Sequence, residues 1–206
     1  MARVRVHQHV NPLSPYFKQE PRPFEISAFA DPAQPLHIDL GCARGRFLLR
    51  LAAERPAANY LGVEIREPLV EEANRLASEA GLVNLHYEFC NAMLWLEKLL
   101  ENIPPGILQT VTIQFPDPWF KKRHAKRRMV NEDMVEVIAK HLPPGGIAFV
   151  QTDIESLAEE MFELFRGNIA FSAAAVGQNP FPVRTEREKA VEDKNLPVYR
   201  RVFMRK

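Results

Sequence analysis

From Leu36 onward, short apolar runs alternate with longer segments of helical periodicity, and this alternation limits the possible folds more than any other feature. Short apolar runs are typical of buried strands, and helical segments between them join such strands in parallel. We expect strands over residues 36–40, 60–65, 84–89, 110–115 and 146–152, and helices over residues 44–54, 67–80, 92–102, 130–142 and 154–166. Repeated strand-helix units predict an α/β fold with a mostly parallel sheet.

Two segments depart from this pattern. Residues 1–35 contain six prolines and little periodicity, which predicts an extended, loosely held arm before a single domain over residues 36–206. Near the end of the chain, apolar runs at 170–176 and 198–204 enclose a polar segment. We therefore expect two final strands that are joined by a functional loop.

Composition narrows the classes of function. With 206 residues and 46% hydrophobic side chains, the chain is long enough for one sizeable core. Because the net charge is only +1, any affinity for nucleic acid must come from local clusters of Lys and Arg. Cys42 and Cys90 form no CxxC pair, and we find neither a signal peptide nor an apolar run of membrane length. These features predict a cytoplasmic protein with no membrane or metal partner.

Residues 37–45 predict a ligand-binding turn, because a strand runs into Gly41 and a helix follows Gly45. In this geometry backbone N–H groups and the helix N-terminus come close to a ligand. A nicotinamide site would need the spacing GxGxxG, whereas here it is Gly41-x-x-x-Gly45, with Asp39 two residues before the first glycine. A nicotinamide oxidoreductase is therefore the weakest alternative.

Polar side chains also follow the next two expected strands. Glu64 can accept both hydroxyls of a ribose, and the amide of Asn91 can face an adenine edge. Separations of about 25 residues from Asp39 to Glu64 to Asn91 bring all three to one crevice of an open α/β sheet. Their common structural alternatives are a turn-capping acid, a solvated strand-end charge and a helix cap, respectively.

The fourth expected strand leads into Pro116-Asp117-Pro118-Trp119. Prolines on both sides restrict the backbone around Asp117, which suits a carboxylate that must keep its direction. Asp117 is therefore the catalytic candidate. The alternatives are an ordinary turn residue for Asp117 and a roof over the core for Trp119.

A dense basic run follows Trp119. It consists of Lys121, Lys122, Arg123, His124, Lys126, Arg127 and Arg128. Such runs are usually solvated faces or localisation signals, but this position, directly after a candidate catalytic strand end, favours phosphate binding. These cations would fix the register of an RNA backbone, with an affinity that falls steeply with salt.

The glycine turn and the acid of the second strand resemble the class I S-adenosylmethionine-dependent methyltransferases, with Ala43 where that class usually has a central glycine. This resemblance implies S-adenosylmethionine as cofactor and a Rossmann-like, doubly wound sheet of seven mostly parallel strands, with helices on both faces and the last strand antiparallel. The motif FPDPWFKKRHAKRR at 115–128, with Gln151-Thr152-Asp153 and the loop 185–188, is more specific. Over residues 36–206 the chain is similar to the bacterial tRNA (guanine-N7) methyltransferases.

The family resemblance implies a set of site residues. Those matching cofactor positions are Asp39, Gly41, Glu64, Asn91 and Asp117, and those matching substrate positions are Lys121, Asp153, Thr185, Glu186, Arg187 and Glu188. The implied substrate is guanine 46 in the variable loop of tRNA. Many relatives carry Asp at position 91 and an aromatic residue at 187. Outside the family context, Asp153 could cap the following helix, and Thr185 and Glu188 could form a surface capping pair.

Guanine N7 already carries an unprotonated lone pair, so methyl transfer from a sulfonium requires alignment and charge placement rather than a general base. A fixed Asp117 carboxylate would stabilise the positive charge that develops on the purine, and Trp119 or Phe120 would offer an apolar wall. The remaining alternatives are a methyltransferase for another nucleobase or a small molecule, and an inactive RNA-binding protein on the same scaffold. Monomer and homodimer both remain open.

Overall fold

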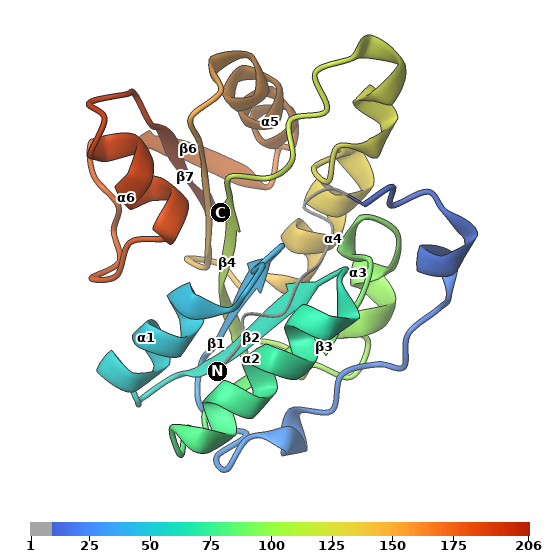
Figure 1. The fold of residues 1–206 in the computed structure, drawn as a ribbon, viewed down its shortest axis with the longest axis vertical. Coiled ribbons are helices and arrows are strands. Elements are labelled where there is room, and N and C mark those ends of the chain that lie inside the picture. Colours follow the sequence, from blue (N-terminus) through green and yellow to red (C-terminus); the bar gives the residue numbers. More distant parts are fainter. Residues whose placement is uncertain (1–9) are drawn as a thin grey trace.

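A computed structural model describes residues 10–206 of the chain and contains a seven-stranded sheet (Figure 1). The strands are β1 Leu36–Leu40, β2 Asn59–Glu64, β3 Leu85–Phe89, β4 Leu108–Gln114, β5 Ile147–Thr152, β6 Phe171–Ala175 and β7 Tyr199–Arg205. Their order is β3-β2-β1-β4-β5-β7-β6, with β1 to β5 parallel and β7 antiparallel to both of its neighbours. This confirms the predicted doubly wound, mostly parallel sheet with an antiparallel last strand.

The helices also follow the sequence pattern. They are α1 Arg46–Glu54, α2 Glu67–Glu79, α3 Ala92–Leu100, α4 Glu132–His141, α5 Glu155–Gly167 and α6 Glu186–Glu192, with short 3-10 turns η1 Pro15–Lys18, η2 Ile26–Ala28 and η3 Lys122–Arg127. The first five α-helices begin and end within two residues of the expected positions. The prediction of a loop between the last two strands is wrong for α6, a short and highly charged helix without an apolar stripe to reveal it.

Two apolar layers hold the helices on the sheet. On one face, Leu48 and Leu51 of α1 and Ala73 of α2 pack with Tyr60 and Tyr87 of the strands. On the other face, the residues Leu96 of α3, Ile138 of α4 and Phe165 of α5 belong to a larger cluster. Full burial of a Leu, Ile or Phe side chain contributes about 1.5–3 kcal/mol, so these layers fix the strand ends that carry the polar residues.

The described part of the arm lies against the domain, contrary to the prediction that it is loosely held. Phe24 and Phe29 are buried in the larger apolar cluster. The backbone N–H of Phe24 donates to the carbonyl of Leu99 at 2.9 Å. In Figure 1 the arm, drawn in blue, runs down the right-hand side of the view beside α3. Residues 1–9, the start of the predicted arm, lie outside the described residues.

Candidate active site

The four polar residues predicted for the crevice all lie at the carboxyl edge of the parallel strands. Asp39 lies near the end of β1, Glu64 ends β2, Asn91 follows β3 and Asp117 follows β4. The first three side chains are 4%, 3% and 6% exposed, whereas Asp117 is half-buried. At this edge β1 separates β2 and β3 from β4 and β5, and ligands of open α/β sheets bind at such a switch point.

The glycine turn after β1 is tied to the end of β2. Gly41 and Gly45 have φ angles of +77° and +68°, and Ala43 between them also adopts a left-handed conformation with φ +52°. The N–H of Gly41 donates to the carbonyl of Val63 at 2.8 Å, and the N–H of Ala43 donates to Glu64 Oε2 at 2.9 Å. The left-handed conformation costs roughly 1–2 kcal/mol for a residue with a Cβ, so Ala43 stores strain that a glycine would not.

Tyr87 of β3 packs against this turn. Its hydroxyl donates to the carbonyl of Gly45 at 2.6 Å. A Cβ on Gly45 would lie 2.4 Å from the Tyr87 ring, and a Cβ on Gly62 would lie 2.3 Å from it. Both positions therefore need glycine because the aromatic ring approaches the backbone so closely.

Glu64 is not the solvated charge that one alternative suggested, because both of its oxygens accept hydrogen bonds. Oε1 accepts from the backbone N–H and Nε of Arg66 at 3.0 and 2.8 Å, and Oε2 accepts from Arg66 Nη2 at 3.0 Å as well as from Ala43. Burial lowers the pKa of Arg66, but the bonds to Glu64 and the charges of Glu64 and Asp117 outweigh it, so the pKa is raised. Asp117 thus lies within electrostatic range of the Glu64–Arg66 pair.

Asp39 is anchored to β4 and is not a turn-capping acid. Its Oδ1 accepts hydrogen bonds from Thr112 Oγ1 at 2.6 Å and from Gln114 Nε2 at 3.2 Å. Burial raises the pKa of Asp39 from 3.8 to about 6, against the lowering effect of these two hydrogen bonds, and the charge of Glu64 raises it further. The protein therefore holds a carboxylate where burial disfavours its charge, which is typical of functional sites.

The N–H groups of the Asn91 side chain are both used within the protein. Its Nδ2 donates to the carbonyls of Pro12 at 2.8 Å and Phe17 at 3.1 Å, both in the arm. Asn91 occupies the N-cap position of α3, yet its side chain makes no capping hydrogen bond. The helix-cap alternative is therefore wrong, and the contact between the Asn91 amide and an adenine stays a prediction.

The backbone around Asp117 is unusual. Phe115 and Trp119 have φ angles of +52° and +44°, and such left-handed conformations of non-glycine residues cluster at functional sites. The N–H of Phe115 donates to the carbonyl of Gln151 at 2.8 Å. Trp119 does not roof the core. Its ring contacts His124, with centroids 5.8 Å apart, and the Arg127 guanidinium at 5.0 Å.

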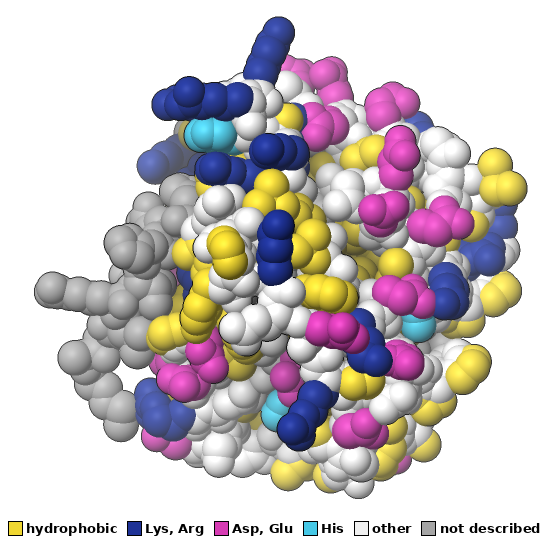
Figure 2. Space-filling view, turned by 90° about the vertical axis from the view of Figure 1, so that its right-hand side faces the viewer, with side chains coloured by type: hydrophobic (Ala, Val, Ile, Leu, Met, Phe, Trp, Pro, Cys, Tyr) yellow, Lys and Arg dark blue, Asp and Glu magenta, His cyan; other side chains and the backbone are white. Residues whose placement is uncertain are grey.

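The basic run forms η3 and its flanking residues. Lys121, Lys122, Arg123 and Lys126 are exposed, and none of them has an acidic partner within 4.0 Å among residues 10–206. Arg128 instead pairs with Glu160 of α5 and donates to the carbonyl of Pro118 at 2.9 Å. In Figure 2, Lys and Arg side chains gather at the top of the molecule, the end at which Figure 1 shows η3.

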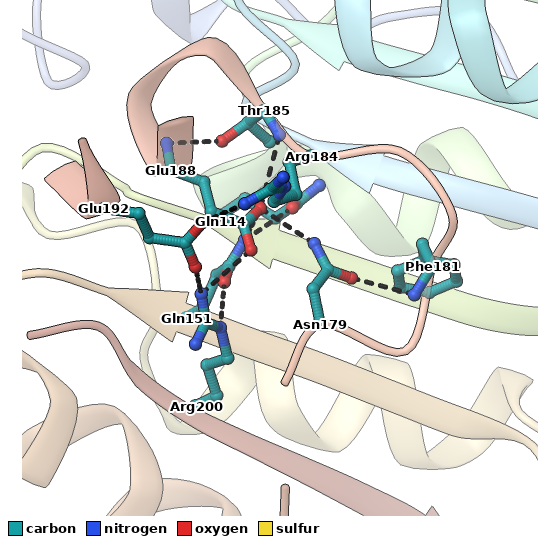
Figure 3. A network of polar contacts seen from close by, with 9 residues as sticks. All are labelled: Gln114, Gln151, Asn179, Phe181, Arg184, Thr185, Glu188, Glu192 and Arg200. Carbon is teal, nitrogen blue, oxygen red and sulfur yellow. Dashed lines mark hydrogen bonds and ion pairs between the residues drawn. The ribbon is translucent and has the colours of Figure 1, made fainter. Parts of the chain in front are cut away.

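A buried polar network joins α6 to the sheet (Figure 3). Glu188 is 0% exposed, and its carboxylate accepts from Arg200 at 2.9 Å, Gln151 at 3.1 Å and Asn179 at 2.8 Å. Gln151 in turn donates to Gln114 at 2.9 Å. Because Gln114 also donates to Asp39, one chain of hydrogen bonds runs from Asp39 in β1 to α6.

The other predicted substrate residues surround this network. Thr185 and Glu188 form a reciprocal capping box on α6, which confirms the capping alternative, although Glu188 is buried rather than at the surface. Glu186 pairs with Arg50 of α1 at 2.7 Å. Arg187 pairs with Asp153 at the end of β5. The helix-cap alternative for Asp153 is wrong, because the N-cap of α5 is Ile154 and no side chain caps it.

Two hollows in residues 10–206 lie away from this edge of the sheet. A hollow of about 810 Å³ lies between α4 and α5, and one of about 350 Å³ lies beside Phe181; neither contains a predicted site residue. Within this range no group of three or more His, Cys, Asp and Glu side chains is placed to hold a metal ion. No helix in the same range is both long and apolar enough to cross a membrane.

The strand order, the glycine turn and the acids at the carboxyl edge define a Rossmann-like methyltransferase. The sequence profile of a family described as "Putative methyltransferase" matches residues 33–201. The tRNA (guanine-N(7)-)-methyltransferase of Synechococcus elongatus is 54% identical, covering 100% of this chain and 98% of the relative. That of Trichormus variabilis is 52% identical, covering 98% and 96%. The chain belongs to the tRNA (guanine-N(7)-)-methyltransferase family.

Solved structures support the fold alone. The aminoglycoside resistance methyltransferase NpmB1 aligns with a TM-score of 0.56 at 20% identity, covering 88% of this chain and 90% of that one. An rRNA methylase from Streptococcus thermophilus aligns with a TM-score of 0.55 at 13% identity, covering 84% and 87%. Family membership contradicts the oxidoreductase and small-molecule alternatives.

Proposed function

We propose that this chain transfers a methyl group from S-adenosylmethionine to N7 of guanine 46 in the variable loop of cytoplasmic tRNA. The observation that carries this proposal is the cluster of Glu64, Arg66 and Asp117 at the carboxyl edge, beside the glycine turn and immediately before the basic run. Two acids next to exposed cations suit a cationic methyl donor and an anionic RNA.

The residues at the turn fit this cofactor. The position of a Cβ on Gly41 has no neighbour closer than Met129, at 3.6 Å. Glu64 would accept the two ribose hydroxyls in place of the Arg66 N–H groups. Asp39, two residues before the turn, is held in place by Thr112 and Gln114 of β4. S-adenosylmethionine supplies an electrophilic methyl group on its sulfonium sulfur.

The remaining residues act on the RNA. Asp117 accepts a hydrogen bond from the Watson–Crick edge of the guanine and stabilises the positive charge that the purine gains. Lys121 and its exposed neighbours bind phosphates, and Phe120, which is 72% exposed, offers a stacking surface for a base. Asp153 and the segment 185–188 form the opposite rim, with charges that are already paired within the protein.

A single assay tests the substrate, the atom and the position. Unmodified tRNA transcript is incubated with the protein and labelled S-adenosylmethionine, then treated with borohydride and aniline, which cleave RNA at 7-methylguanine. We expect incorporation of label and one cleavage at position 46. Label without cleavage would place the methyl group on another atom, and cleavage elsewhere would assign another guanine.

The substitution Asp117→Asn tests the catalytic role. It removes the charge that stabilises the purine cation, so we expect kcat to fall by about 100-fold or more. Calorimetry should still detect cofactor binding, because Glu64 and the glycine turn are intact. The matched control is Asp133→Asn, at an exposed position in the first turn of α4. Wild-type turnover in Asp117→Asn would remove this residue from the chemistry.

A further inference from the structure

The arm is tied to the carboxyl edge of the sheet by a single buried side chain. Asn91 uses both hydrogens of its amide on arm carbonyls, those of Pro12 and Phe17. An asparagine at an N-cap normally accepts a hydrogen bond from the first turn of its helix, and this interaction is absent here. The Asn91 side chain therefore binds the arm and does not cap α3.

The held segment also contacts the strand and helix next to Glu64. The hydroxyl of Tyr16 donates to Glu67 Oε2 in the first turn of α2, at 3.1 Å. The Tyr16 ring lies 6.3 Å from the ring of Phe89, the last residue of β3, and Pro12 is buried. Residues 12–17 therefore span the ends of β2 and β3, the side of the edge on which the adenine of the proposed cofactor would lie.

The oxygen of the Asn91 amide, Oδ1, is the part of the side chain that the described part of the arm does not use. This oxygen accepts no hydrogen bond from the residues that the structure describes, and the two N–H groups fix which end of the amide is the oxygen. An adenine presents an exocyclic amine, which is a donor. This carbonyl oxygen is an acceptor and thus suits a donor such as the adenine amine.

We propose that residues 12–17 form the outer wall of the adenine end of the cofactor site, and that Asn91, which the family resemblance already assigns to the cofactor, holds this wall with its two N–H groups. This inference rests on the proposed use of S-adenosylmethionine. Cofactor binding and closure of the arm are then coupled, because the same amide takes part in both.

The substitution Asn91→Asp separates the two roles. Aspartate still accepts from an adenine amine, but it faces the carbonyls of Pro12 and Phe17 with an oxygen instead of two N–H groups. If the wall contributes, calorimetry on the full chain with S-adenosylhomocysteine should show a Kd about tenfold higher than that of the wild type. An equal or lower Kd would overturn the proposal.

Two further variants distinguish loss of the wall from a general loosening of the structure. Tyr16→Ala removes an exposed side chain of the wall and should also raise the Kd. Asn102→Asp makes the same chemical change at another arm contact, that with Glu25, away from the strand ends, and should leave the Kd unchanged. An increase with Asn102→Asp equal to that with Asn91→Asp would reduce the effect to general loosening of the arm and would overturn the proposed wall.

Hydrogen exchange measures the coupling between cofactor binding and closure of the arm directly. In the wild type, S-adenosylhomocysteine should slow exchange of the backbone amides of residues 13, 14 and 16–18, and in Asn91→Asp it should not. Binding without any change at these amides would overturn the wall and leave the proposed function intact. Failure of the wild type to bind S-adenosylhomocysteine at all would instead overturn the proposed cofactor, and the wall with it.

Discussion

The basic run 121–128 and the segment 184–200 both border the candidate site and both carry dense charge, but they use it in opposite ways. In the basic run, Lys122 and Arg123 are exposed and lack acidic partners within the described chain. In the segment 184–200, Arg184, Arg187 and Arg200 each pair with an acid, and Glu188 is fully buried. Charge that is neutralised internally fixes the structure, whereas charge left exposed is available to phosphates.

The largest effect should come from breaking the buried network. Glu188→Ala leaves the Arg200 guanidinium buried with one fewer carboxylate and removes the capping box of α6. Loss of one partner of a buried pair costs about 3–5 kcal/mol, so we expect the free energy of unfolding in urea to fall by this amount. This would be a large share of the stability of a single domain.

The matched comparison is Lys122→Ala with Arg123→Ala, which should change the free energy of unfolding by less than about 0.5 kcal/mol. If Glu188→Ala instead unfolds like the wild type but fails to methylate tRNA, the segment must rearrange and bring Glu188 into contact with the substrate. That result would show that the charges of the segment 184–200 also bind the substrate, as those of the basic run are proposed to do.

The second prediction concerns the end of the network at Asp39. The pKa of this buried carboxyl is about 6 in the folded protein and 3.8 ordinarily, so the folded state binds more protons between these values and stability falls as the pH rises through them. Asp39→Asn carries no such penalty and still offers an oxygen to Thr112 and Gln114. We expect it to be more stable than the wild type by about 2–3 kcal/mol above pH 6.

The difference should vanish below about pH 4, where the carboxyl is protonated in both states. Urea unfolding of the two proteins at pH 4, 5, 6 and 7.5 measures it. Cofactor affinity should decline in the same variant, since the charge is retained at a cost in stability. A constant difference across this pH range would mean that Asp39 titrates normally.

The third prediction tests the exposed cations. Lys122→Ala with Arg123→Ala should weaken tRNA binding about tenfold and reduce the slope of log K against log salt by about 1.5. Fluorescence anisotropy with labelled tRNA at several salt concentrations measures both quantities. The control is Arg75→Ala with Lys98→Ala, which removes two surface cations that already pair with acids. An unchanged slope in the first variant would relocate the RNA surface.

The same contrast explains what could be predicted from the sequence. The first five helices and all seven strands follow from periodicity, which is a local property. The basic run can be recognised from the sequence because its charges lie next to one another in the chain. Periodicity does not predict helix α6, which has no apolar stripe, although its capping box, Thr185-x-x-Glu188, is a sequence signal for a helix start.

The partners of buried polar groups could not be predicted in this way. The sequence pattern correctly predicts Asn91 at a strand end, but its partners Pro12 and Phe17 are 79 and 74 residues away in the chain. Likewise, Glu188 reaches Gln151 only through the fold, 37 residues apart. Sequence position gave the edge of the sheet on which a side chain lies, whereas the direction of each hydrogen bond depends on segments that only tertiary packing brings together.

The smallest effect, and the finest test of the contrast, belongs to Arg187. It lies in the paired segment, but its side chain is 58% exposed, and it joins Asp153 at the rim of the site. Because an exposed ion pair contributes at most about 1 kcal/mol, Arg187→Ala should lower the free energy of unfolding by no more than this. Since Asp153 already neutralises this guanidinium, the salt dependence of tRNA binding should also stay unchanged. A slope reduced by about 0.7–0.9 would show that Arg187 leaves Asp153 for a phosphate, and would move it from the structural group of charges to the RNA-binding one.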